Sequence, residues 1–188
     1  MDDAELAVRA AAGRPGAFEA LLDRYGGRVR SVALRIAGGD TSFADDLTQE
    51  VFVHLLRVLP RYEPSQPFAP WLFRVAANLC RNKVRDRRRR PAASLEAVED
   101  AVGERPGRAI DPADAAEHAE DLLRVREARD ALPESYRTIL ALRYEAGMDL
   151  DDVAAALGGL PMGTVKNRLF RARAALAAKL GVRIEAER

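Results

Sequence analysis

The stretch from Phe68 to Arg90, FAPWLFRVAANLCRNKVRDRRRR, constrains the fold of this chain more than any other. It begins with apolar and aromatic residues and ends in a run of arginines. If the stretch is helical, polar side chains recur on one face at Arg74, Asn78, Arg81 and Arg85. The opposite side carries Leu72, Val75, Ala76 and Leu79. Such a helix has to bury one side in a core and expose the other as a surface of guanidinium and amide groups.

The basic end of this stretch indicates a partner with many negative charges. Between Arg81 and Arg90, seven residues are basic and one is acidic. Like charges at this density repel one another unless an anion lies opposite them. Arginine and asparagine together suit phosphates and the edges of nucleic acid bases. The alternative interpretation is an amphipathic helix whose charged face is only solvated.

The remaining sequence predicts an all-α fold. Strand signals are nearly absent, and proline and glycine fall between segments with helical periodicity. We expect Ser42 to be the N-cap of the third helix, Pro60 to end that helix, and Asp149 to cap a short late helix. The expected helices span about residues 3–12, 15–37, 42–59, 71–90, 112–132, 133–146, 149–157 and 164–180.

Charge divides the 188 residues into parts although the formal net charge is only +1. Residues 91–121 hold nine acidic and two basic residues, whereas residues 163–188 hold seven basic and two acidic ones. The acidic stretch is also rich in small residues and is broken by glycine and proline, as is typical of linkers. We therefore expect two small helical domains, residues 1–90 and 112–188, joined by an acidic flexible linker at residues 91–111.

Several classes of protein are disfavoured by the composition. Cys80 is the only cysteine, so an internal disulfide is impossible and a reducing cytoplasm is expected. The acidic first residues do not resemble a signal peptide, and no apolar run reaches the roughly 20 residues of a membrane helix. Adjacent acids such as Asp45 and Asp46 point about 100° apart on a helix, so no metal or catalytic site is expected. The chain is predicted to be a cytoplasmic protein without a cofactor and not an enzyme.

The C-terminal part has the pattern of a helix-turn-helix. A short helix with a centre of small residues (154–156) is followed by a glycine-containing turn and a basic helix. The core stripe of the last helix is Val165, Leu169, Ala172, Leu176 and Leu180. Facing away are Lys166, Asn167, Phe170, Arg171 and Arg173, with Arg168 at the flank. An outward phenylalanine among basic residues suits a major groove, where it can contact a thymine methyl group.

Taken together, these motifs resemble those of bacterial RNA polymerase sigma factors of the extracytoplasmic-function group. The resemblance is carried by ADDLTQEVFVHLL, WLFRVAANLCRNKVRDRRRR, LPESYRTILALRYEAGMDLDDVAAALG and GTVKNRLFRARAAL in this order. It covers roughly residues 18–90 and 132–180 and implies a sigma region 2 followed by a sigma region 4. A sigma factor directs core RNA polymerase to the −10 and −35 promoter elements and promotes melting of the DNA.

The resemblance also implies roles for individual residues. Polymerase binding falls on Asp45, Asp46, Gln49 and Glu50. Recognition of the −10 element, including capture of a flipped base by the loop before the basic helix, falls on Arg61, Tyr62, Phe68, Trp71, Arg74, Asn78, Arg81, Asn82 and Arg85. Recognition of the −35 element falls on Arg143, Thr164, Lys166, Asn167, Arg168, Phe170, Arg171 and Arg173.

The implied partners are the clamp of the largest polymerase subunit, the flap of the second-largest subunit, promoter DNA and an anti-sigma factor, without membrane insertion. The sequence departs from the family pattern at a few points. GLPMGTV is one residue longer than the usual turn, Asn167 replaces a serine, Asn82 replaces an aspartate, and no further domain follows the last helix. The alternative function is a freestanding helix-turn-helix transcription regulator with a helical sensor domain, in which the polar face of DDLTQEVF would have no purpose.

Overall fold

The computed structural model describes residues 1–89 and 112–182, with side chains for residues 1–89, 120 and 122–182. All regular elements in these ranges are helical, which confirms the predicted all-α class. They are α1 (Asp3–Ala11), α2 (Ala17–Ala37), α3 (Thr41–Val58), η1 (Leu59–Arg61), α4 (Phe68–Arg89), α5 (Pro112–Asp130), α6 (Glu134–Leu140), η2 (Ala141–Glu145), α7 (Leu150–Ala156) and α8 (Met162–Leu180). The predicted linker at residues 91–111, and Arg90, lie outside the described residues.

Aspartate side chains start three of the helices. The carboxylates of Asp2, Asp40 and Asp149 each accept a hydrogen bond from the backbone N–H three residues later, at 2.7, 2.9 and 2.8 Å. The prediction for Asp149 is confirmed. The prediction that Ser42 caps α3 is wrong, because Asp40 takes that position and Ser42 lies within the first turn. Gly38 and Gly39, both at positive φ, end α2 and turn the chain into this cap.

Two further helix boundaries differ from the sequence expectation. Helix α4 begins at Phe68, so Pro70 lies in its first turn, where a missing N–H leaves no helical hydrogen bond unmade. Helix α6 ends at Leu140 and continues as the π-helical turn η2, in which the N–H of Ala146 bonds the carbonyl of Ala141 at 2.9 Å. A periodic pattern shows that a helix continues, but it does not show a one-residue change in its hydrogen bonding.

The helices form two groups around apolar cores. In the first group α2, α3 and α4 pack together, with α1 across their end, and bury Leu21, Val29, Leu47 and Phe73. In the second group α5, α6 and α7 pack against α8. Each core side chain lies on the apolar stripe of its helix, as amphipathic periodicity requires.

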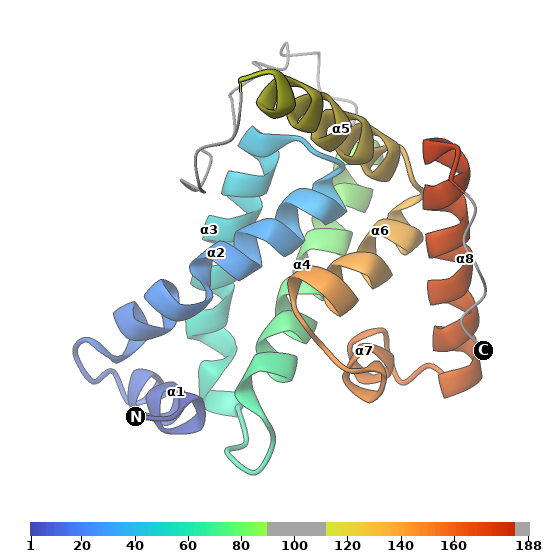
Figure 1. The fold of residues 1–188 in the computed structure, drawn as a ribbon. Coiled ribbons are helices and arrows are strands. Elements are labelled where there is room, and N and C mark those ends of the chain that lie inside the picture. The colour runs from blue at the N-terminus through green and yellow to red at the C-terminus, as the bar shows by residue number, and fades with distance from the viewer. Residues whose placement is uncertain (90–111, 183–188) are drawn as a thin grey trace.

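The two groups also pack against each other. Helix α2 contacts α6 and η2, while α4 contacts α6 and α7, so α4 lies between the two groups (Figure 1). Buried apolar residues from both groups belong to one continuous cluster. The sequence predicts the two helical groups but not this closed arrangement. None of the helices among the described residues has the length and apolar character that crossing a membrane would require.

Candidate nucleic-acid and polymerase interfaces

Helix α4 separates its apolar and polar sides as predicted. Of the predicted apolar side, Leu72 and Ala76 are buried and Val75 and Leu79 are half-buried, while Phe73 and Cys80 complete the buried side. The predicted DNA-facing residues are exposed or half-buried: Asn78, Asn82 and Arg85 are exposed, whereas Arg74 and Arg81 are half-buried. The helix therefore presents amides and guanidinium groups from a rigid, core-anchored support.

Three aromatic side chains that were assigned to the −10 loop lie inside the protein. Tyr62, Phe68 and Trp71 are each at most 7% exposed. Their ring centroids are 5.1 to 5.9 Å apart, and Phe68 also meets Tyr25 edge-on at 5.6 Å. The hydroxyl of Tyr62 donates to the carbonyl of Gln66 at 2.6 Å.

These rings build the loop and leave no open face on which a base could stack. The sequence could not reveal this, because an aromatic residue in a proline-rich loop suits either a core or a surface pocket. Burial raises the pKa of Tyr62, and the negative charges of Asp2 and Asp3 add to that effect. Of the three loop residues predicted to contact DNA, Arg61, Tyr62 and Phe68, only Arg61 is exposed. A base-stacking role for the aromatic rings stays a prediction.

The arginines of α4 face an acid from the second helical group. The carboxylate of Glu134, the first residue of α6, lies 3.7 Å from the Nε atoms of Arg81 and Arg85 and 3.9 Å from Nη1 of Arg88. Three cations around one carboxylate leave an excess of positive charge, which is what a phosphate-binding surface needs. Sequence analysis missed Glu134 because it is 46 or more residues from its partners, at which distance spacing patterns carry no signal.

The polar face of α3 is partly occupied and partly open. Asp45 receives a hydrogen bond from Nε of Arg30 at 2.6 Å, and Glu50 pairs with Lys83 of α4 at 2.5 Å. Asp46 and Gln49 are exposed. The ion pairs of Asp45 and Glu50 connect α3 to its neighbours, and both carboxylate side chains remain 49% and 45% exposed.

Two apolar residues extend this open face. Val53 and Leu56 are 52% and 49% exposed, and they follow Gln49 at four and seven positions. Leu56 has the helical spacing of a core residue relative to the buried Phe52 and Leu59, yet it is itself exposed. Exposed apolar side chains beside polar ones are typical of the centre of a protein–protein interface.

The predicted helix-turn-helix is present as α7, a five-residue turn and α8. The turn passes through Gly158 and Gly159, at φ of 91° and 75°, a conformation that glycine adopts without strain. Helix α8 starts at Met162, so Met162 and Gly163 lie in its first turn rather than in the connection. Val165, Leu169 and Ala172 are buried, and Leu176 and Leu180 are half-buried, along the predicted core stripe.

The opposite face of α8 carries the predicted DNA-reading residues. Lys166, Asn167, Phe170 and Arg171 are exposed, Phe170 by 56%. Thr164 is also exposed. A hollow of about 350 Å³ lies at the start of this face and is lined by Tyr136, Gly163, Thr164, Asn167, Arg168 and Arg171. The helix thus offers amide, guanidinium and apolar groups together, the combination that reads base edges in a major groove.

Two arginines predicted to contact the −35 element have protein partners instead. Arg143 donates from Nη1 to the carbonyl of Met148 at 2.7 Å, which holds the chain between η2 and α7. Arg173 donates from Nε to the hydroxyl of Tyr144 at 2.7 Å and lies over the Tyr144 ring at 5.6 Å. Both side chains are half-buried, so in this structure they shape the helix-turn-helix rather than extend its DNA face.

An apolar groove lies on the other side of α8. It has a volume of about 410 Å³ and is walled by Val125, Leu140, Leu176, Leu180 and Val182, with Tyr144 and Arg173 at its edge. Arg35 of α2 reaches this groove as well, so both helical groups contribute to its lining. Among the residues the structure describes, no three His, Cys, Asp or Glu side chains gather as metal ligands would.

Comparison with known proteins agrees with this geometry. A family model described as Sigma-70 region 2 matches residues 21–90, which include α3 and α4. A second model, described as Sigma-70, region 4, matches residues 122–176, which include the helix-turn-helix. A match to region 2 disfavours the alternative of a freestanding regulator, because the N-terminal helices are then not a sensor domain.

Whole-length relatives support the same assignment. The RNA polymerase sigma-H factor of Pseudomonas aeruginosa is 33% identical over 180 residues, covering 93% of this chain and 91% of that protein. The ECF RNA polymerase sigma-E factor of Escherichia coli K12 is 32% identical over 189 residues, covering 96% of this chain and 95% of that protein.

Solved structures match across both helical groups. CnrH, solved in complex with the cytosolic domain of CnrY, aligns with a TM-score of 0.65 at 29% identity, covering 95% of this chain and 97% of that one. The sigma factor RpoE of Bartonella quintana, solved with the anti-sigma factor NepR, has the same fold, with a TM-score of 0.68 at 24% identity over 89% of this chain and 98% of that one. The chain therefore belongs to the extracytoplasmic-function group of RNA polymerase sigma factors, with a region 2 and a region 4 of the sigma-70 type.

Proposed function

We propose that this sigma factor binds core RNA polymerase through the exposed face of α3 and places α4 on the −10 element and α8 on the −35 element. In this division residues 1–90 form region 2, residues 91–111 connect the regions, and residues 112–188 form region 4. The observation that supports the proposal most is that α4 and α8 are two core-anchored helices with separate basic faces. Helix α4 lies within the region 2 match, and most of α8 lies within the region 4 match.

The proposed polymerase contact consists of Asp46, Gln49, Val53 and Leu56. The two apolar side chains would supply buried area at the centre of the contact, and the polar pair would set its register. Asp45 and Glu50 would support this contact indirectly, because their ion pairs with Arg30 and Lys83 hold α3 in place. The groove beside α8 is a second surface suited to an apolar helix, and we assign it to the flap of the second-largest subunit.

The proposed −10 contact uses Arg61, Arg74, Asn78, Arg81, Asn82 and Arg85. Arginine would hold phosphates, while asparagine offers a donor and an acceptor to a base edge. The buried rings of Tyr62, Phe68 and Trp71 would contribute by holding the loop and the start of α4 in shape.

The proposed −35 contact uses Thr164, Lys166, Asn167, Arg168, Phe170 and Arg171. Arg143 and Arg173 support this surface from within the fold. The protein itself would catalyse no reaction; the free energy that opens the DNA comes from binding to polymerase and promoter. We place it in the cytoplasm with RNA polymerase and expect an anti-sigma factor, since CnrH and RpoE were each solved with a bound partner.

Transcription with purified core RNA polymerase tests the proposal. The full chain should co-migrate with the core enzyme and produce promoter-dependent transcripts from a library of genomic fragments. Footprinting of the resulting complexes should show two protected elements separated by a constant spacing. Binding to duplex DNA without any association with polymerase would instead support the freestanding regulator.

A further inference from the structure

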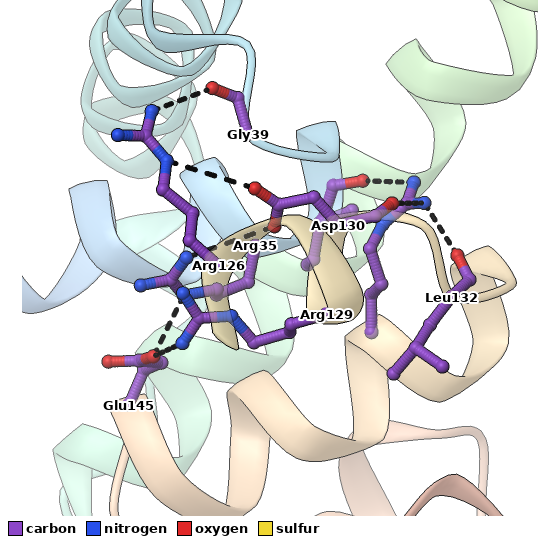
Figure 2. A network of polar contacts seen from close by, with 9 residues as sticks. Arg35, Gly39, Arg126, Arg129, Asp130, Leu132 and Glu145 are labelled. Atoms are coloured by element: carbon purple, nitrogen blue, oxygen red, sulfur yellow. Dashed lines mark hydrogen bonds and ion pairs between the residues drawn. The ribbon is translucent and has the colours of Figure 1, made fainter. Parts of the chain in front are cut away.

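A half-buried polar network joins region 2 to region 4. Arg35 of α2 donates from Nε to the carboxylate of Glu145 at 3.0 Å, and its Nη1 lies 3.8 Å from Asp130 of α5. Arg129 adds a second cation 3.7 Å from Glu145. Arg126 pairs with Asp130 and reaches the carbonyl of Gly39 (Figure 2). Two acids of region 4 thus bind cations from both regions.

Arg137 connects backbone carbonyls of the two regions. Its guanidinium donates to Ile36 near the end of α2 at 2.9 Å, and to Leu132 and Asp130 at 2.7 and 3.1 Å. The residue is only 6% exposed. The C-terminal carbonyls of α2 carry a partial negative charge and lack a helical hydrogen-bond donor. Arg137 of region 4 therefore caps the C-terminal end of α2 in region 2.

The backbone of region 2 approaches the network closely at two glycines. A Cβ added at Gly39 would overlap the carboxylate of Asp130, whose Cγ would lie 2.8 Å away. A Cβ at Gly38 would lie 3.3 Å from Cζ of Arg137. The closed arrangement therefore depends on glycine at the turn between α2 and α3.

This interface has the chemistry of a contact that can open. Nη1 of Arg35, Nε of Arg129, Oδ1 of Asp130 and Nε of Arg137 are buried without a hydrogen bond. Burial raises the pKa of Asp130 and lowers the pKa of Arg129 and Arg137, since it disfavours their charged forms. Opening would return these groups to water, so the ionic part of the interface adds little net stability to the closed arrangement.

The same arrangement covers part of the proposed −10 surface. Helix α7 packs against α4, and Glu134 lies among Arg81, Arg85 and Arg88 as a DNA phosphate would. The Glu134 side chain is only 12% exposed. In contrast, Asp46, Gln49, Val53 and Leu56 of α3 are exposed in this arrangement.

We propose that region 4 masks the −10 surface of the free sigma factor, with Glu134 in the place of a DNA phosphate. The contacts of Arg35, Asp130, Glu145 and Arg137 hold the two regions in this closed arrangement, which we call the closure. The masking rests on the function proposed above. Polymerase can engage α3 while the regions are closed, and separation of the regions then frees the arginines of α4. Binding to promoter DNA is thereby coupled to prior binding to polymerase within a single chain.

The substitution Gly39→Ala, which adds a Cβ that would overlap Asp130, tests the closure by energy transfer between two dyes. Donor and acceptor dyes go on cysteines introduced at Ser42 and Leu123, which are exposed and lie near the contact between Gly39 and Arg126. Cys80 is buried and should not be labelled in the folded protein. Wild type should show high energy transfer, and Gly39→Ala should lose most of it. The matched control is Gly16→Ala, because Gly16 also has positive φ, 75° against 86°, but a Cβ there meets nothing within 4 Å.

A charge change at Glu134 tests the masking without disturbing the fold. The readout is the affinity of the free sigma factor for a fluorescent single-stranded 20-mer of random sequence at low salt, measured by anisotropy. Glu134→Gln should raise this affinity by about fivefold or more, as expected for the loss of an intramolecular competitor. Glu127→Gln, an exposed acid on α5, removes the same charge and should leave the affinity unchanged.

Each outcome decides the proposal. Equal energy transfer in Gly39→Ala and Gly16→Ala overturns the proposed closure at Gly39. High transfer in wild type that persists after core polymerase is added overturns the proposed opening. Equal gains from Glu134→Gln and Glu127→Gln overturn the masking, because net charge would then explain both. If wild type forms no transcribing complex with polymerase, the proposed function fails, while the energy-transfer comparison still reports whether the regions close.

Discussion

Arg137 of α6 donates a hydrogen bond to the carbonyl of Ile36 in α2 at 2.9 Å, across 101 residues of sequence. This contact brings the C-terminal end of a region 2 helix and the start of region 4 into one polar cluster. It also explains why an arginine is tolerated at 6% exposure, since three carbonyl oxygens surround its guanidinium.

Arg137→Leu should lower the free energy of unfolding by on the order of 3 kcal/mol, because three buried carbonyls lose their donor. Urea unfolding followed by circular dichroism measures this. Arg14→Ala, which removes an exposed arginine from the loop before α2, is the control and should change stability little. Equal stability of both variants would mean that water replaces the guanidinium without loss.

Leu56→Glu should weaken binding to core polymerase by about 30-fold or more, because it places a charge at the centre of the proposed α3 contact. The measurement is competition with a labelled wild-type sigma factor for the core enzyme. Val8→Glu makes the same substitution at a 46% exposed residue of α1 and should compete like wild type. If both variants compete equally, α3 is not the docking surface.

Arg171→Ala should reduce the affinity of the reconstituted holoenzyme for −35 duplex DNA by about 1 to 3 kcal/mol and relax its sequence preference. Lys179→Ala removes an exposed cation from the last turn of the same helix and serves as the matched control. A uniform loss across all DNA sequences would show that Arg171 holds a phosphate rather than reading a base.

Phe68→Ala should destabilise the protein by about 3 to 5 kcal/mol, since Phe68 is buried against Tyr25, Tyr62 and Trp71. Thermal unfolding measures the loss. Arg61→Ala in the same loop should change stability by less than about 0.5 kcal/mol. If Phe68→Ala is stable but defective in DNA opening, the ring acts on a base after all.

Cys80 should resist alkylation in the folded protein. Burial raises the pKa of its thiol to about 12, so almost no thiolate exists at neutral pH. Because the unfolded thiol titrates near 9.0, its contribution to stability is complete below that pH and is lost as the pH rises from 9.0 to about 12. Iodoacetamide labelling with and without urea measures the first effect, and the pH dependence of unfolding relative to Cys80→Ala measures the second. Rapid labelling of the native protein would contradict the burial.

Local patterns predicted much of the candidate site. Helical spacing correctly separated Asn78 and Arg85 from Leu72 and Ala76 on α4, and Phe170 and Arg171 from Val165 and Leu169 on α8. These assignments succeed because an amphipathic helix has to bury its apolar stripe, so the sequence identifies the outward face without knowing what covers the other side.

The same patterns do not fix the burial or the partners of a residue that has two plausible environments. Leu56 has the spacing of a core residue yet is 49% exposed, whereas Tyr62 and Phe68 sit in a proline-rich loop yet are buried. Arg143 of η2 and Arg173 of α8 bond to Met148 and Tyr144. In each case the outcome depends on which side chains lie nearby in space, and single-helix periodicity does not contain that information.

By itself, the sequence determined an all-α chain with two basic amphipathic helices, a capped helix-turn-helix and the family to which they belong. Only the tertiary structure decided that region 4 closes on region 2, with Glu134 among the arginines of α4 and Arg137 against the end of α2. The physical reason is that helix formation and capping depend on residues within a few positions. A salt bridge or a buried guanidinium depends instead on groups that only folding brings together.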